Sequence, residues 1–155
     1  MMLQSGRRRV GQNRVVTPDP LPRLRRLCLA LPETTERLSH GEPTWFVGGR
    51  TTFVMYADHH HDDRVACWCA APAGAQRARV AEDPHRFFAP PYVGGRGWVG
   101  VWLDVPVNWD QMADLVADAY QTVAPKRLVA ALDRRGPATP APAGRERPRR
   151  SGGRR

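Results

Sequence analysis

Three absences limit what this 155-residue chain can be. It has only three cysteines, Cys28, Cys67 and Cys69, which are too few and too unevenly spaced for the disulfide framework of a small secreted protein. It has no run of about 20 apolar residues, the length that a membrane-spanning helix needs. No apolar stretch follows the arginines at 7–9, as one would in a secretory signal. We therefore expect a cytoplasmic protein in a reducing compartment, without a membrane partner.

Lysine is nearly absent as well. The chain has 24 basic residues, and all of them except Lys126 are arginine. Arginine binds phosphate through two parallel hydrogen bonds, so this bias favours phosphate recognition. The codon usage of a GC-rich genome would produce the same bias, and both explanations stay open.

The positive charge is concentrated at the two ends of the chain. Residues 1–20 have a net charge of +3 and residues 134–155 a net charge of +7, whereas residues 21–133 have a net charge of −1. A strongly basic protein is a candidate for nucleic-acid binding. Here that argument applies to the two terminal segments and not to the segment between them.

These three segments also differ in composition. Residues 1–20 and 134–155 are rich in arginine, proline, glycine and polar residues, which cannot bury apolar area. We expect a disordered basic lead and a disordered basic tail. Residues 21–133 are enough for one domain with its own core, and we expect a monomer rather than an obligate oligomer.

The first half of this domain predicts a helix followed by a strand meander. Leucines at helical spacing predict a helix that has Pro22 in its first turn and ends at Pro32. Aromatic and β-branched runs on both sides of Gly48-Gly49 predict a hairpin. A third strand, over 65–69, follows a polar turn at 59–63.

The second half predicts helices on either side of one strand. We expect a short helix over 74–82, no regular element over the proline-rich residues 87–92, and a strand over 98–103. Asn108 is expected to cap a long helix, with Gln111 as its capping-box partner, and Pro125 to start a short last helix. This order predicts an α+β two-layer sandwich in which helices cover one face of an antiparallel sheet.

The polar turn is the first candidate for a ligand site. His59, His60, His61 and Asp62 supply imidazole and carboxylate groups, which suit zinc, nickel or iron. Adjacent residues in a tight turn point apart, so a solvated turn without a metal is the competing interpretation.

The cysteines are a second candidate. Cys67 and Cys69 are two residues apart on a predicted strand, so both thiols should face the same side of the sheet. Such a pair can ligate a metal, but no second pair completes a four-ligand site. Burial as small apolar side chains is the alternative, and we favour it.

Catalytic groups are sparse. Glu33, Glu36 and His40 could take part in acid–base chemistry, but no nucleophile motif or phosphate-binding loop accompanies them. We expect no enzymatic activity and no cofactor.

Four motifs occur in order along the central segment. They are Leu-Ala-Leu-Pro-Glu at 29–33, His-Gly-Glu-Pro-Thr-Trp-Phe-Val-Gly-Gly-Arg at 40–50, Asp-Pro, Phe-Phe, Pro-Tyr and Gly-Trp-Val within 83–99, and Ala-Tyr and Ala-Pro-Lys-Arg within 119–127. In this order and spacing they resemble the MmcQ/YjbR family of small bacterial proteins, over about residues 21–133.

The resemblance implies a frataxin-like (CyaY-like) fold and a non-catalytic role in DNA binding. The DNA-binding label of this family rests on a likeness to a "double-wing" fold in which β-hairpins contact DNA. The wings of this chain would be the hairpins around Gly48-Gly49 and around residues 59–63. The residues expected to contact phosphates are Arg50, Arg64, Lys126 and Arg127 in the domain, and Arg149 and Arg150 in the tail.

Two functions are therefore expected. The first is DNA binding of low sequence specificity, because contacts to phosphates position a protein without reading the bases. The alternative is a small-molecule or metal-binding domain, frataxin-like, that uses the turn from His59 to Asp63 together with Cys67 and Cys69.

Overall fold

The computed structural model describes residues 18–60 and 62–135. The elements follow in the order α1 (Leu21–Leu29), β1 (Thr34–Ser39), β2 (Glu42–Val47), β3 (Thr51–Asp58), β4 (Val65–Cys69), α2 (Ala75–Glu82), β5 (Phe87–Phe88), the 3₁₀ turn η1 (Gly94–Arg96), β6 (Val99–Trp102), α3 (Trp109–Val123) and α4 (Lys126–Arg135). None of the helices in these described ranges is long and apolar enough to cross a membrane.

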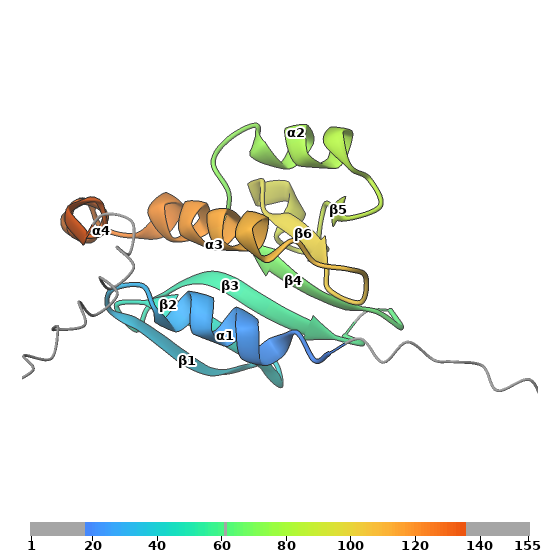
Figure 1. Ribbon diagram of the computed structural model, residues 1–155, viewed down its shortest axis with the longest axis horizontal. Coiled ribbons are helices and arrows are strands. Elements are labelled where there is room, and N and C mark those ends of the chain that lie inside the picture. The colour runs from blue at the N-terminus through green and yellow to red at the C-terminus, as the bar shows by residue number, and fades with distance from the viewer. Residues whose placement is uncertain (1–17, 61, 136–155) are drawn as a thin grey trace, which may run out of the picture.

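All six strands form one antiparallel sheet in the order β1-β2-β3-β4-β6-β5. Helices α1 and α3 lie side by side on one face of this sheet, and α2 packs near β5 and β6 (Figure 1). This arrangement confirms the expected α+β sandwich of helices on an antiparallel sheet.

The long helix α3 begins as the sequence predicts. The Asn108 side chain accepts a hydrogen bond from the backbone N–H of Gln111 at 3.1 Å. The other half of the capping box does not form, because the Gln111 side-chain oxygen is buried without a hydrogen-bond partner. The buried stripe of the helix contains Met112, Leu115, Val116, Ala119 and Tyr120, at the helical spacing expected from the sequence.

Tyr120 joins three elements of the core. Its ring is fully buried and meets the ring of Phe53 on β3 edge to face, with 5.8 Å between the centroids. Its hydroxyl donates a hydrogen bond of 2.8 Å to the carbonyl oxygen of Pro32, just after α1. The helix layer is therefore tied both to the middle of the sheet and to the first helix.

Two strands were not predicted from the sequence. β1 is an edge strand with polar and charged side chains, so it lacks the apolar alternation that indicates a strand. It pairs with β2 through a tight turn in which His40 and Gly41 both have positive φ. β5 has only two residues, Phe87 and Phe88, inside the segment that was expected to be irregular.

The register of β3 and β4 separates the two faces of the sheet. Residues opposite each other project to the same side, so the pair Val54 and Cys69 faces the helices and the pair Met55 and Trp68 faces away. The same open face carries Trp102 on β6 and Phe88 on β5, whose rings stack with centroids 4.0 Å apart. Aromatic side chains thus occupy both faces.

The stacked pair on the open face leads to a stability prediction. A Cβ atom on Gly100 would overlap the ring of Phe88, which rests on Trp102, so Gly100→Ala should lower the free energy of unfolding by about 1–3 kcal/mol. Urea denaturation measures this change.

Gly95→Ala is the matched control, because its Cβ would meet no atom within 4 Å. It should leave the unfolding midpoint nearly unchanged. Equal midpoints for the two variants would show that the Phe88 ring moves aside at no cost.

Candidate functional site

The two predicted wings lie at opposite ends of the sheet. They flank the same strand, β3, and successive turns of an antiparallel meander must lie at opposite ends of the strand they share. The Gly48-Gly49 turn lies at the end where α4 is found, and the 59–63 turn lies at the other end, beside the β1–β2 turn (Figure 1). The two wings are therefore separated by the length of β3 and do not lie side by side.

The end with α4 carries basic side chains. Arg50 is exposed and forms no ion pair with any described residue, and Lys126 is exposed at the start of α4. The Arg37 guanidinium reaches the same turn, where it donates a hydrogen bond of 2.9 Å to the carbonyl oxygen of Gly49. Two of the predicted phosphate contacts, Arg50 and Lys126, are therefore brought to one end.

Arg127 lies at this end as well, but its charge is compensated. Its two terminal nitrogens donate hydrogen bonds of 3.0 and 2.9 Å to the carboxylate of Glu33. These bonds lower the pKa of Glu33 and raise that of Arg127. The Glu33 carbonyl oxygen accepts a hydrogen bond from Gly48 N–H at 2.9 Å, which connects α4 to the turn.

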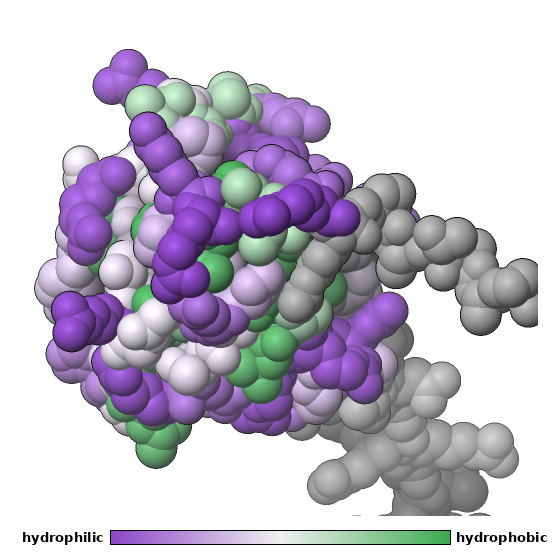
Figure 2. Space-filling model, turned by 90° about the vertical axis from the view of Figure 1, so that its left-hand side faces the viewer, coloured by the Kyte–Doolittle hydropathy of each residue, from purple (hydrophilic) through white to green (hydrophobic). Residues whose placement is uncertain are grey.

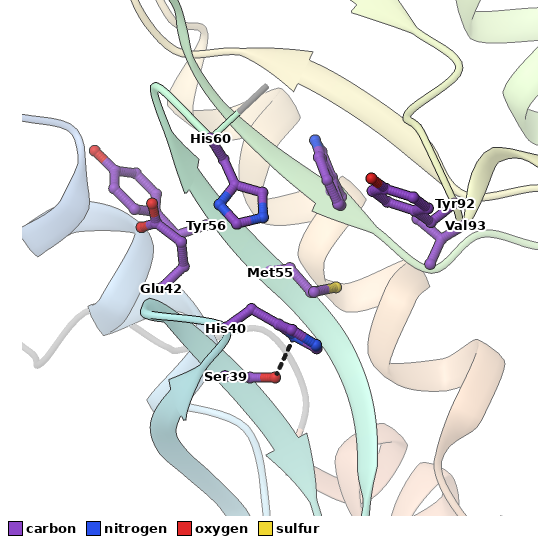
Figure 3. Close-up of a pocket in the computed structure, with 9 residues that line it drawn as sticks. Ser39, His40, Glu42, Met55, Tyr56, His60, Tyr92 and Val93 are labelled. Carbon is purple, nitrogen blue, oxygen red and sulfur yellow. Dashed lines mark hydrogen bonds between the residues drawn. The ribbon is translucent and has the colours of Figure 1, made fainter. Parts of the chain in front are cut away.

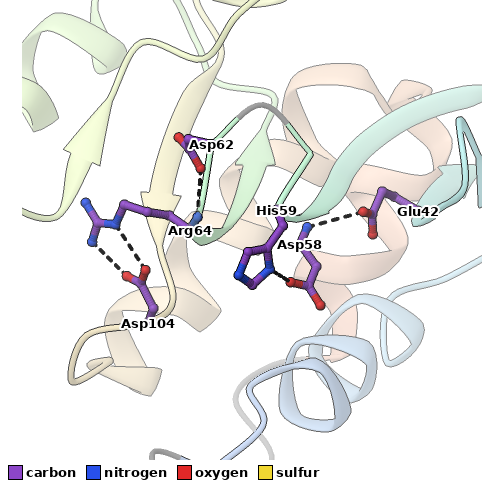
Figure 4. A network of polar contacts seen from close by, with 6 residues as sticks. All are labelled: Glu42, Asp58, His59, Asp62, Arg64 and Asp104. Atoms are coloured by element: carbon purple, nitrogen blue, oxygen red, sulfur yellow. Dashed lines mark hydrogen bonds and ion pairs between the residues drawn. The ribbon is translucent and has the colours of Figure 1, made fainter.

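Arg64 is at the opposite end and is held by two neighbours. It donates hydrogen bonds of 3.0 and 2.7 Å to Asp104, just after β6 (Figure 4). Its guanidinium also lies 3.8 Å from the centroid of the Trp102 ring. The hydrogen bonds from Arg64 are the main cause of a lowered pKa at Asp104.

The polar turn at this end is acidic, and its described side chains point to different partners. His59 hydrogen-bonds to Asp58, which raises the pKa of His59, and Asp62 accepts a hydrogen bond from the Arg64 N–H at 3.0 Å (Figure 4). The His60 ring instead approaches Trp68 edge to face, 6.3 Å between centroids. Within 18–60 and 62–135, no three metal-ligating side chains gather.

The structure does not describe three of the residues that were expected to bind a metal or phosphate. His61, Arg149 and Arg150 lie outside the described residues.

The cysteine pair faces the helices. Cys67 and Cys69 are buried on the same side of β4, as predicted, with their sulfur atoms 3.9 Å apart. The hydrogen bond to Cys69, together with burial, raises the pKa of the Cys67 thiol, and burial raises that of Cys28. The two thiols lie on the helix side of the sheet, whereas Trp68, beside His60, lies on the open side, so the turn and the cysteines do not form one site.

The two carboxylates considered for acid–base chemistry are held in ion pairs. Glu36 accepts hydrogen bonds of 2.8 and 2.9 Å from Arg25 on α1 and a further one of 3.1 Å from the indole nitrogen of Trp45. Glu33 is held by Arg127, and the His40 side chain hydrogen-bonds to Ser39 instead. These groups are engaged with separate partners and do not converge on one point.

A pocket of about 400 Å³ on the open face was not foreseen from the sequence. The side chains around it come from strands β1 to β4 and from the loops that carry His40, His60 and Tyr92; Figure 3 shows these three residues around Met55. The residues that line it are Ser39, His40, Glu42, Met55, Tyr56, His60, Trp68, Tyr92 and Val93. The sequence gives no local signal for this pocket, because its walls come from segments up to 54 residues apart.

Comparison with known protein families assigns the chain to one of them. The YjbR family profile matches residues 29–122, which is more than half of the chain. The chain belongs to the YjbR family. Among curated protein sequences, none matches it significantly.

A solved structure has the same fold as this YjbR domain. The crystal structure of Deinococcus radiodurans protein DR2400, a DUF419 domain, superposes with a TM-score of 0.58 at 16% sequence identity. The match covers 74% of this chain and 86% of the other. At this identity the likeness supports the fold alone.

The Glu36 ion pair gives a pH prediction. Its hydrogen bonds from Arg25 lower the folded-state pKa of Glu36 below the unfolded value of about 4.3. The stabilisation is therefore complete above the unfolded pKa and is lost as the pH falls through the folded pKa. Glu36→Gln should cost about 1 kcal/mol at pH 7 and flatten the loss of stability below about pH 4.5.

Urea denaturation between pH 3 and pH 7 measures this dependence. Glu33→Gln is the control, because the pair between Glu33 and Arg127 is exposed and should matter little. If Glu36→Gln and the unmodified chain lose stability in parallel as the pH falls, the assigned role of Glu36 is wrong.

Proposed function

We propose that this YjbR-family protein is a non-catalytic DNA-binding protein of low sequence specificity. Its contact surface would be the end of the domain that carries the Gly48-Gly49 turn and the start of α4. The observation that carries the proposal is the meeting of exposed basic side chains at the end that carries α4. In the sequence, the arginine-rich residues 136–155 come directly after this helix.

The charges of the domain favour this end over the other. Arg37, Arg50, Lys126 and Arg127 lie here with Glu33, and α4 adds Asp133 and Arg134. Strongly hydrophilic residues cover much of this end, with apolar groups between them (Figure 2). At the far end, Arg64 is paired with Asp104. Further carboxylates lie in or beside the turn there; they belong to Glu42, Asp58, Asp62 and Asp63.

Affinity would come mainly from the displacement of cations from DNA. Each phosphate neutralised by a basic side chain adds about 0.9 to the slope of log K against log salt concentration. The tail, with Arg149 and Arg150, would supply most of these contacts, and Arg50 and Lys126 would orient the domain. Because Arg64 is held at the acidic end, we leave it out of this surface.

The absence of catalysis is part of the proposal. The raised pKa values keep the thiols of Cys28 and Cys67 protonated, so these thiols do not offer a nucleophile. Glu33 and Glu36 are committed to ion pairs. A DNA-binding role would place the protein in the cytoplasm of a bacterium.

The test is fluorescence anisotropy of the full chain with a random-sequence DNA duplex across a salt series. The double variant Arg50→Ala/Lys126→Ala should bind several-fold more weakly at low salt and reduce the salt slope by nearly 2, about 0.9 for each lost contact.

The matched control is Arg77→Ala/Arg96→Ala. It also removes two positive charges, but from exposed positions in α2 and η1. These elements lie away from α4 in Figure 1. It should leave the salt slope unchanged. Equal salt slopes for the two double variants would mean that the end with Arg50 and Lys126 does not orient the domain on DNA.

A further inference from the structure

The pocket on the open face has the walls of a small-molecule site. Its volume of about 400 Å³ falls within the range of about 300–1,000 Å³ that such sites occupy. Met55 and Trp68 are partners in the register of β3 and β4, so they form one continuous floor. Trp68 is only 5% exposed, which holds this wall in place.

Tyr92 lies at the rim of the pocket and has an unfavourable backbone conformation. Its side chain is 82% exposed, and its φ of 63° lies in the left-handed region, which bulky residues rarely adopt. Glycine or asparagine would occupy this position with less strain. Tyr92 is not a core residue, and it lines the pocket.

The fixed charge at the pocket is negative, and two histidines, His40 and His60, also line it. Glu42 supplies the one carboxylate among the described lining residues, and no lysine or arginine is among them. Glu42 accepts a hydrogen bond of 3.3 Å from Asp58 N–H, which fixes it beside the acidic turn. Arg64 lines an adjacent hollow that shares Trp68 and His60 with the pocket. It is paired with Asp104.

We propose that this pocket binds a small planar organic cation, an aromatic ring system that carries an amine. The ring would pack against Trp68, Tyr92 and Met55, and the ammonium group would lie near Glu42. Aromatic faces attract cations, and this attraction grows when the site excludes water. This site is separate from the proposed DNA surface, which lies at the opposite end of β3.

The whole chain provides an internal control for this selectivity. Its formal net charge is +9, so non-specific attraction would favour an anion over a cation. A preference for the cation must therefore come from a local site.

The experiment titrates the ¹⁵N-labelled full chain with three probes at one pH and 150 mM salt. Tryptamine, tryptophol and indole-3-acetate share one ring system and carry a cation, no charge and an anion. Tryptamine should bind with a dissociation constant near 1 mM and at least tenfold more tightly than indole-3-acetate. Its amide shifts should centre on His40, Met55, His60 and Trp68.

Two variants separate the roles of the ring and the charge. Tyr92→Asn should weaken tryptamine binding about fivefold, and asparagine tolerates the positive φ of this position. Glu42→Gln should reduce the preference for tryptamine over indole-3-acetate to threefold or less. Leu38→Ala is the control, since Leu38 is exposed and apolar but does not line the pocket.

The proposal would be overturned by equal binding of the three probes or by tightest binding of indole-3-acetate. It would also be overturned if Tyr92→Asn and Leu38→Ala bound tryptamine equally well. The amide shifts report on the pocket directly. The outcome of this test is therefore independent of any result with DNA.

Discussion

In an antiparallel meander, side chains alternate between two faces and turns alternate between two ends. Both alternations decide what this YjbR domain presents to solvent. The first directs Cys67 and Cys69 under the helices, and leaves Trp68 on the open face. The second separates the basic Gly48-Gly49 turn from the acidic 59–63 turn by the length of β3. A domain with almost no net charge therefore has a basic end and an acidic end.

Three ion pairs connect different elements of the domain. Arg25 with Glu36 joins α1 to β1, Arg127 with Glu33 joins α4 to the start of the sheet, and Arg64 with Asp104 closes the far end. Each pair uses a bidentate arginine geometry, which fixes orientation as well as distance. Many of the domain's arginines thus serve the fold, and composition alone overstates how many remain for a partner.

The sequence was most informative where the signal is local. Leucine spacing and Pro22 predicted α1, Asn108 predicted the start of α3, and Gly48-Gly49 predicted the β2–β3 hairpin. It was least informative at β1, whose polar side chains hide an edge strand, although the His40-Gly41 turn was a usable signal. The pocket could not be predicted, because Tyr92 reaches Trp68 only through the packing of the loop before η1 on the open face.

The opposite placement of the two wings could have been deduced before the structure, since the predicted hairpins share one strand. The most direct test of the account is an amide-shift map of the ¹⁵N-labelled full chain with a short DNA duplex. We predict shifts at Gly48, Gly49, Arg50 and along α4, and none at His40, His60 or Asp62. Shifts centred on the 59–63 turn would contradict the assignment of the DNA surface to the basic end.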